Sequence, residues 1–261
     1  MRPARSCLFV PGNRPERFDK ALASGADAVI VDLEDAVAPQ HKAAARDAVV
    51  AWLSPKRPVV LRINAINTPW FAEDLALCRH PGVAAVMLAK TESAEDLAPL
   101  AGVAVIPLIE SAAGFDRLRE IAAAPRVQRL AFGAIDFQLD LGLHAHYEEL
   151  LFFRSQLVLA SRLAGLAAPL DSPSTAIEDT GAVQTEAQAA RRLGFGGKLC
   201  IHPRQLEVVN AAFSATAEEV AWAQGVLAAA ARSEGAAVSL NGQMIDKPVI
   251  LRAQAILAQR G

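Results

Sequence analysis

Eight short apolar runs recur along the chain, and longer alanine-rich segments with helical spacing separate them. Each run is four to seven residues long and lacks strict alternation of polar and apolar residues, which is typical of parallel strands covered on both faces. The predicted strands are 7–11, 28–33, 59–63, 85–89, 103–109, 129–133, 166–170 and 198–201. The clearest predicted helices are 15–24, 42–53, 70–79, 114–123, 148–163 and 186–193.

This alternation predicts an α/β fold, a (β/α)8 TIM barrel, because barrels of this type need about 250 residues. An open, doubly wound parallel sheet is the main alternative. That fold often binds dinucleotides through a glycine-rich turn after a strand, and no such motif follows any of the predicted strands. We therefore place the barrel at residues 1–203 and assign 204–261 to a C-terminal helical extension and flap of the same domain.

The predicted extension has three parts: a helical stretch at 204–231, a polar, turn-rich piece at 239–247, and a short final helix at 249–259. No internal repeat or low-complexity linker divides it from the barrel. Such an extension would cover the open end of the barrel or reach a neighbouring subunit.

Composition excludes several classes of protein. Hydrophobic residues make up 52% of the 261 residues, which is too many for a disordered chain. The formal net charge is −2, so no overall basic field exists to hold nucleic acid or an anionic membrane. Three widely spaced cysteines form neither a C-x-x-C pair nor a disulfide framework, and no apolar run reaches the ~18 residues of a membrane span. We expect a soluble cytoplasmic protein.

Polar or ionisable residues follow every predicted strand. The carboxyl ends of parallel barrel strands converge on one face, where the catalytic groups of such barrels lie. Any one of these residues is more often a solvated or ion-paired loop residue, but together they bring several carboxylates and cations to one ring. In strand order they are Asn13 and Arg14, then Asp32, Glu34 and Asp35, then Arg62 and Asn64, Lys90, Glu110, Asp136, Asp171 and His202.

Glu110 and Asp136 follow neighbouring strands, so their carboxylates can converge. Two like charges close together are unfavourable unless a cation lies between them. Because the ligands would be oxygens, the pair predicts Mg²⁺, with Mn²⁺ as a possible substitute and water or substrate oxygens at the remaining positions. Gly133 lets the backbone approach closely just before Asp136. The alternative is that one of the two acids caps the following helix, as Glu110 before Ser111 would.

Arg62 lies among aliphatic residues in the segment LRIN, so its guanidinium should have a specific partner. The natural partner of this fixed fork is a carboxylate bound through two hydrogen bonds. We expect that carboxylate to belong to the substrate, which Arg62 would orient and neutralise. The alternative is a pair with Glu34 or Asp35 of the preceding strand end, and the two roles are compatible.

The acidic segment VDLED ends the second predicted strand. We expect Glu34 and Asp35 to support the metal indirectly, with Glu34 hydrogen-bonded to a water molecule on the ion. Lys42 and Arg46 on the next helix could equally tie this acidic cluster down structurally. His202 precedes a proline beside a helix start, where a histidine is more often a structural hydrogen-bonding group than a base.

Seven segments occur in an order that resembles the citrate lyase β-subunit-like family, which includes malyl-CoA, citramalyl-CoA and β-methylmalyl-CoA lyases. They are LFVPGNRPERFDKA, VIVDLEDAVAPQHKAAAR, LRIN, LIES, FGAIDFQLDLG, GKLCIHP and NGQMIDKP. The resemblance covers essentially the whole chain, and its first two segments are the most specific. It departs from the family pattern at Ile135, where many members carry an acidic residue.

The resemblance implies a Mg²⁺-dependent barrel enzyme that makes or breaks a carbon–carbon bond between an acyl-CoA thioester and an α-keto acid. By this resemblance, Glu110 and Asp136 bind the metal, and Arg62 holds the keto-acid carboxylate beside Glu110. Asp246, in NGQMIDKP, would enter an adjacent subunit's site as the acid or base, and Arg14 would contact CoA phosphate. The family also implies a homotrimer or a multiple of it.

Three other functions remain open at this point. The chain could be a citryl-thioester lyase subunit that acts on an acyl carrier protein, or a Mg²⁺-dependent pyruvate aldolase that needs no CoA. It could also be a non-catalytic barrel, although the joint presence of Arg62, Glu110, Asp136 and Asp246 argues against this.

Overall fold

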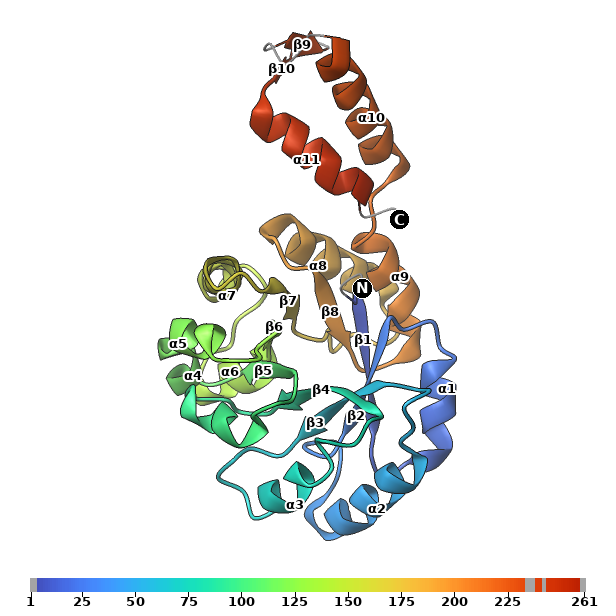
Figure 1. Ribbon diagram of the computed structural model, residues 1–261, viewed down its shortest axis with the longest axis vertical. Helices are drawn as coiled ribbons and strands as arrows, with labels where there is room; N and C mark the ends of the chain where they lie inside the picture. Colours follow the sequence, from blue (N-terminus) through green and yellow to red (C-terminus); the bar gives the residue numbers. More distant parts are fainter. Residues whose placement is uncertain (1–3, 233–237, 241–242, 259–261) are drawn as a thin grey trace. The chain divides into compact units, whose positions relative to one another are not determined.

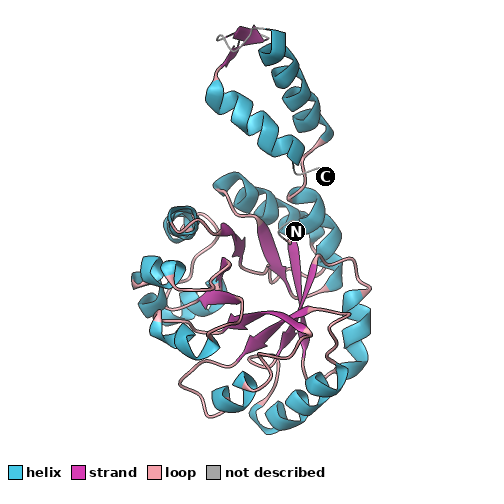
Figure 2. Ribbon diagram, in the orientation of Figure 1, coloured by secondary structure: helices cyan, strands magenta, loops and turns pink. Residues whose placement is uncertain are grey.

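Eight parallel strands close into a barrel in the order of the sequence, as the apolar runs predict (Figures 1 and 2). The computed structural model describes residues 4–232, 238–240 and 243–258. Each strand lies within two residues of its predicted bounds. The strands are β1 (Ser6–Pro11), β2 (Ala28–Asp32), β3 (Val59–Ile63), β4 (Val83–Leu88), β5 (Val105–Ile109), β6 (Arg129–Phe132), β7 (Ala167–Asp171) and β8 (Gly197–Cys200).

Helices surround the barrel, but several are shorter or more divided than their patterns predict. The predicted helix 114–123 is two helices, and 186–193 is the second half of a longer one whose N-cap is Asp179. The α-helices are α1 (Phe18–Leu22), α2 (Lys42–Trp52), α3 (Phe71–Leu75), α4 (Ala112–Asp116), α5 (Leu118–Ala123), α6 (Ala134–Leu141), α7 (Leu151–Leu163) and α8 (Thr180–Leu193). The 3-10 helices are η1 (Pro15–Arg17), η2 (Pro39–His41), η3 (Glu95–Leu100) and η4 (Pro203–Gln205).

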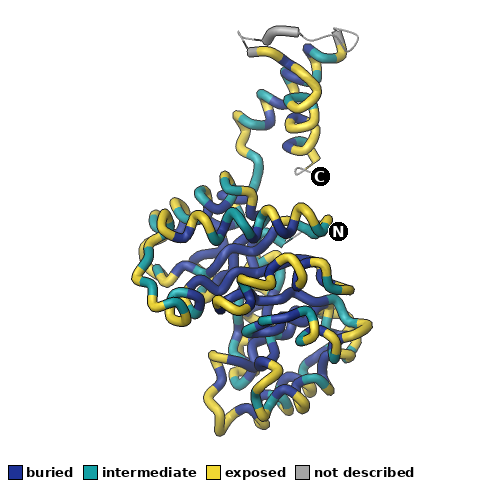
Figure 3. Tube along the Cα trace, turned by 90° about the vertical axis from the view of Figure 1, so that its left-hand side faces the viewer, coloured by how far each residue is buried: buried dark blue, intermediate teal, exposed yellow. Residues whose placement is uncertain are grey.

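The interior of the barrel is filled by one or two buried apolar side chains from every strand, which form a single cluster. Figure 3 shows that buried residues are concentrated in the barrel strands. Alternation along each strand decides which residue comes next on the inward face. Two residues beyond Ile30, Val60 and Leu108, toward the carboxyl end, this face carries Asp32, Arg62 and Glu110. An apolar core thus underlies a polar layer at the carboxyl ends of the strands, which we call the mouth of the barrel. The core cluster is Cys7, Ile30, Val60, Ala85, Met87, Ile106, Leu108, Ala131, Leu170 and Leu199.

The chain divides into two compact units, the first spanning Pro3–Val209 and the second containing the chain from Asn210 onward. Helix α9 (Leu206–Ala212) crosses this boundary, and the second unit continues with α10 (Ala217–Arg232), β9 (Val238–Leu240), β10 (Gln243–Ile245) and α11 (Lys247–Ala258). Helices α10 and α11 share their own apolar core, which includes Val226 and Ala253. The described part of the predicted turn-rich piece includes an antiparallel pair, β9 with β10. Among the described residues, no helix has both the length and the hydrophobicity needed to cross a membrane.

Candidate active site

Arg62 is held at the mouth by a bidentate pair with Asp32. Its Nε donates to Asp32 Oδ1 over 2.7 Å, and its Nη2 donates to Asp32 Oδ2 over 2.5 Å. Its Nη1 lies 3.3 Å from Glu34 Oε2, and its guanidinium stacks 4.6 Å from the ring centre of Phe9. Of the two acids predicted as alternative partners of Arg62, Glu34 does contact it. The main partner, however, is Asp32. Because the fork uses two of the five N–H groups of a guanidinium, others remain for a second carboxylate.

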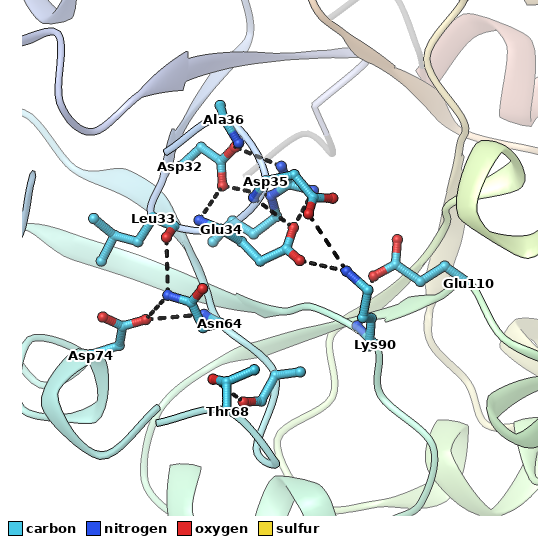
Figure 4. A network of polar contacts seen from close by, with 12 residues as sticks. Asp32, Leu33, Glu34, Asp35, Ala36, Asn64, Thr68, Asp74, Lys90 and Glu110 are labelled. Atoms are coloured by element: carbon cyan, nitrogen blue, oxygen red, sulfur yellow. Dashed lines mark hydrogen bonds and ion pairs between the residues drawn. The ribbon is translucent and has the colours of Figure 1, made fainter. Parts of the chain in front are cut away.

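Asp32 organises the turn that follows β2 as well as holding Arg62. Its Oδ1 accepts a hydrogen bond from the N–H of Glu34 (2.8 Å), and its Oδ2 accepts one from the N–H of Ala36 (3.1 Å; Figure 4). Its side chain is fully buried, so these donors replace the water that an exposed carboxylate would bind. The sequence places Asp32 in the acidic cluster, but it does not identify Asp32 as the partner of Arg62.

Glu34 is held on both of its carboxylate oxygens. Lys90 Nζ donates to Oε1 over 2.5 Å, and the N–H of Asp35 donates to Oε2 over 2.9 Å (Figure 4). Burial raises the pKa of Glu34, and the charge of Arg62 opposes this rise. Asp35 itself is exposed and lies 3.6 Å from Lys90 Nζ.

Lys42 anchors the same turn. This agrees with the alternative in which Lys42 holds the acidic segment structurally. Its buried ammonium donates to the carbonyl oxygens of Leu33 (2.8 Å) and Glu34 (2.7 Å) and to Asn64 Oδ1 (2.7 Å). Asn64 in turn donates through Nδ2 to Asp74 Oδ2 (2.6 Å) and to the carbonyl of Leu33 (Figure 4). This network fixes the backbone that carries Glu34.

Arg46 takes a different role from the one considered for it. From α2 it pairs with Glu73 and, at 3.2 Å, with Asp74, two acids of α3. Arg46 thus supports the network around Asn64 and does not contact the acidic turn directly.

Glu110 and Asp136 lie near enough for the charge of Asp136 to act on Glu110. Glu110 is 3% exposed, and its Oε1 accepts a hydrogen bond from the N–H of Lys90 over 2.7 Å. Burial first, and the charge of Asp136 second, raise the pKa of Glu110 to about 8. Asp136 is partly exposed in the first turn of α6, a helix that the apolar pattern does not predict. The capping alternative for Glu110 is wrong, since Ser111 caps α4 by accepting from the N–H of Gly114.

Gly133 is required beside this pair because no side chain fits there. A Cβ added to Gly133 would lie 2.4 Å from Glu110 Oε2 and 2.6 Å from Glu110 Cβ. Ordinary van der Waals contacts begin near 3.4 Å, so any larger residue would have to displace Glu110.

The two carboxylates fit a magnesium ion. Their mutual repulsion and the burial of Glu110 are what a bound cation would relieve, and both ligands supply the hard oxygen donors that Mg²⁺ prefers. In the described part of the chain, no group of three or more histidine, cysteine or acidic side chains could hold a metal. A Mg²⁺ ion here would therefore keep several positions for water or substrate oxygens, which is common for this ion.

The hydrogen bonds found for the remaining predicted residues are with groups outside this cluster. Arg14 is exposed at the start of η1, and its Nε donates to Glu16 Oε1 over 2.6 Å. Asp246 is an exposed residue of the second unit, where its Oδ1 accepts from the N–H of Val249 at the start of α11 over 3.2 Å. The structural interpretation of His202 is confirmed, because its ring accepts from the N–H of Arg204 and caps η4.

Lys90 is the mouth residue whose role the sequence did not reveal. Its position directly after the fourth apolar run was a usable signal, since strand ends of this barrel carry the site. Its contacts with both Glu34 and Glu110 depend on a backbone conformation that no sequence pattern indicates.

Comparisons with known proteins identify the family of this chain. Residues 5–203 match the family described as HpcH/HpaI aldolase/citrate lyase. A citrate lyase subunit beta-like protein of Mycobacterium tuberculosis is 42% identical, over 97% of this chain and 94% of the relative. An L-malyl-CoA/beta-methylmalyl-CoA lyase of Cereibacter sphaeroides is 32% identical, over 99% of this chain and 95% of the relative.

A solved structure supports the same assignment. The crystal structure of the protein CitE from M. tuberculosis, in complex with magnesium, acetoacetate and coenzyme A, superimposes with a TM-score of 0.90 and 41% sequence identity. The match covers 99% of both chains. The chain therefore belongs to the HpcH/HpaI aldolase/citrate lyase family, as the resemblance carried by its motifs predicts.

Proposed function

We propose that this protein is a Mg²⁺-dependent carbon–carbon lyase of the malyl-CoA/citramalyl-CoA type. It would cleave a β-hydroxyacyl-CoA thioester into acetyl- or acyl-CoA and an α-keto acid, or form the thioester from these two compounds. The observation that carries this proposal is the buried Glu110, paired with Asp136, in the same polar layer as the anchored guanidinium of Arg62. The magnesium and coenzyme A held by the related CitE structure support it.

Glu110 and Asp136 would hold the Mg²⁺ ion, which when bound supplies Lewis-acid polarisation of the substrate's hydroxyl and carboxylate oxygens. Arg62 would receive that carboxylate on the N–H groups that Asp32 does not use, and would neutralise its charge. Because Asp32 fixes the plane of the guanidinium, Arg62 would need little reorganisation when substrate binds.

Two proton transfers accompany cleavage. A base takes the proton of the substrate's hydroxyl group, and that oxygen becomes the carbonyl oxygen of the keto acid as the carbon–carbon bond breaks. The electron pair of the broken bond moves onto the thioester as an enolate. Asp246 would then protonate the enolate carbon, or remove that proton in the condensing direction. We propose that Asp246 acts in the site of an adjacent subunit of a homotrimer or a multiple of it, and that the exposed Arg14 contacts CoA phosphate.

Four CoA thioesters test the proposal: malyl-, citramalyl-, citryl- and hydroxymethylglutaryl-CoA, each with Mg²⁺ and with a chelator. The keto acid and the acyl-CoA product are both quantified. Release of both products in equal amounts from at least one thioester, and only with the metal, is the expected result. Cleavage only of carrier-protein thioesters, or only of free hydroxy-keto acids, would replace the CoA lyase with one of the two other enzyme types.

A further inference from the structure

Lys90 lies between the two groups of acids at the mouth. It follows β4, which lies between β3, the strand of Arg62, and β5, the strand that leads to Glu110. Its φ angle is +49°, a left-handed conformation that a residue with a side chain seldom adopts. In this conformation its N–H donates to Glu110 Oε1 over 2.7 Å. A strained backbone at Lys90 thus holds one of the two acids proposed to bind the metal ion.

The side chain of the same residue holds the opposite acid. Lys90 Nζ donates to Glu34 Oε1 over 2.5 Å, and Figure 4 shows the lysine side chain lying between Glu34 and Glu110. The second oxygen of Glu34 accepts from the N–H of Asp35 and lies 3.3 Å from Arg62 Nη1. With Lys90 present, both oxygens of Glu34 are therefore bound on the β2 side of the mouth.

Glu34 and Glu110 both contact Lys90, Glu34 through the ammonium and Glu110 through the backbone N–H. The charge of Glu34 acts on Glu110 strongly enough to contribute to its raised pKa. Both side chains are buried, so water screens this interaction poorly. A Glu34 carboxylate without its ammonium partner would therefore be drawn toward a cation on Glu110 and Asp136.

We propose that Lys90 is a positioning residue that keeps Glu34 from becoming a third protein ligand of the metal ion. Its N–H orients Glu110 toward the ion, while its ammonium holds Glu34 away from it. This inference rests on the proposed function, because it concerns the ion that Glu110 and Asp136 would bind there.

The chemical consequence is an open coordination shell. Mg²⁺ and Mn²⁺ take about six oxygen ligands, and a keto acid that chelates the ion needs two neighbouring positions. A third carboxylate would occupy one position and add a negative charge beside the anionic substrate. Lys90 would thus weaken binding of the metal ion and strengthen binding of the substrate.

Mn²⁺ is the probe for the test, because its binding and its bound water are measured by electron paramagnetic resonance and water proton relaxation without turnover. For Lys90→Met we expect Mn²⁺ to bind several-fold more tightly than to the wild type, with one fewer exchangeable water on the ion. Pyruvate should bind the Mn²⁺ form about tenfold more weakly, within the range for residues that orient metal ligands. Lys90→Arg should restore both values toward the wild type.

A second comparison tests whether the effect of Lys90→Met on Mn²⁺ affinity requires the carboxylate of Glu34. It compares the double variant Lys90→Met/Glu34→Gln with the single variant Glu34→Gln. The double variant should return Mn²⁺ affinity to within about twofold of Glu34→Gln, since no carboxylate then remains to enter the shell. Lys56→Met is the matched control: it removes an exposed lysine from the loop before β3, at the opposite ends of the strands, and should change neither affinity.

The possible failures are distinguishable. Equal weakening of Mn²⁺ and pyruvate binding in Lys90→Met, or no change in either, would overturn the role of Lys90 while the proposed function stands. Tighter Mn²⁺ binding that persists unchanged in the double variant would likewise overturn it. A wild-type protein that binds no Mn²⁺ would overturn the proposed function, and this inference with it.

Discussion

Arg62 and Asp32 illustrate at the scale of single residues how the site depends on buried charge. The side chain of Arg62 is 11% exposed and that of Asp32 is 1% exposed, so neither has enough water around it to carry its charge alone. The pair is therefore a structural requirement of the mouth as well as a preparation for substrate. Burial and the charge of Asp32 act in opposite directions on Arg62, and its pKa is raised.

Asp32→Asn should destabilise the protein by about 3 kcal/mol, because removing one partner of a buried pair leaves the other charge uncompensated. Urea denaturation followed by circular dichroism measures this change. Glu178→Gln is the control: it breaks an exposed pair with Arg204 and should cost less than about 1 kcal/mol. Equal effects of the two substitutions would show that the buried pair is not needed for folding.

Gly133→Ala should weaken Mg²⁺ binding about tenfold or more, since its Cβ would displace Glu110 from its position beside Asp136. Calorimetric titration with Mg²⁺ measures the affinity. Gly181→Ala serves as the comparison, because its Cβ near the start of α8 would meet only Asp179 Oδ1, at 3.3 Å. Unchanged affinity in Gly133→Ala would mean that Glu110 does not need its present place to bind the ion.

At the scale of elements, the strands were predictable and the helices less so. Parallel strands covered on both faces are marked by continuous apolar runs, and all eight runs became strands within two residues of their bounds. Helix α6 was missed because FGAIDFQLDLG reads as a strand end followed by a mixed segment, yet it carries Asp136. The left-handed backbone of Lys90 could not be predicted, because its contacts are with Glu34 and Glu110, which follow β2 and β5 and are distant in sequence.

The positions of the site residues on the strands were predictable from the sequence, but the pairing of their side chains was not. Asp32, Arg62 and Glu110 share the inward face because each lies two residues beyond a core residue, a spacing that sequence alone displays. Which of these charges pair with one another depends on side-chain reach across the mouth. The sequence therefore indicated Glu34 or Asp35 as partners of Arg62, while Asp32 makes the fork.

Cys7 on β1 and Cys200 on β8 lie on the two strands that close the barrel, and both are buried. Burial raises the pKa of Cys7 to about 11 and that of Cys200 to about 12. A free thiol ionises near pH 8.5, roughly, so these groups contribute stability that is complete below that pH and is lost as the pH rises through 11 and 12. We expect the native protein to resist thiol labelling at pH 8 until urea opens the barrel.

The matched variant Cys7→Ala/Cys200→Ala should show a shallower loss of unfolding free energy between pH 9 and 11, because fewer buried thiols then ionise on unfolding. Labelling of the native wild type at the same rate as the unfolded chain would contradict the closed barrel in solution.

At the scale of the whole molecule, the chain consists of two compact units with separate apolar cores. The proposed metal ligands and Arg62 belong to the first unit, and the proposed acid or base, Asp246, belongs to the second. The proposed substrate-binding residues and the proposed acid or base thus belong to different units of the chain.

Asp246→Ala should leave Mg²⁺ and pyruvate binding unchanged while it slows turnover by roughly 10²- to 10⁴-fold, the usual contribution of a positioned acid or base. Turnover of the preferred CoA thioester and calorimetry on the same sample separate the two effects. If Asp246 acts in a neighbouring subunit, mixed oligomers of Asp246→Ala and Glu110→Gln chains should regain activity that neither variant has alone. A normal rate in Asp246→Ala would assign proton transfer to another residue.

The most direct test of the account is a calorimetric titration of Mg²⁺, followed by pyruvate, into the wild type, Glu110→Gln and Asp136→Asn. We expect the wild type to bind one ion per chain and to bind pyruvate only after the ion. Each variant should lose both steps, while its thermal midpoint stays level or rises because one of two repelling charges is gone. Variants that bind Mg²⁺ and pyruvate as tightly as the wild type would contradict the assignment of Glu110 and Asp136 as the metal ligands.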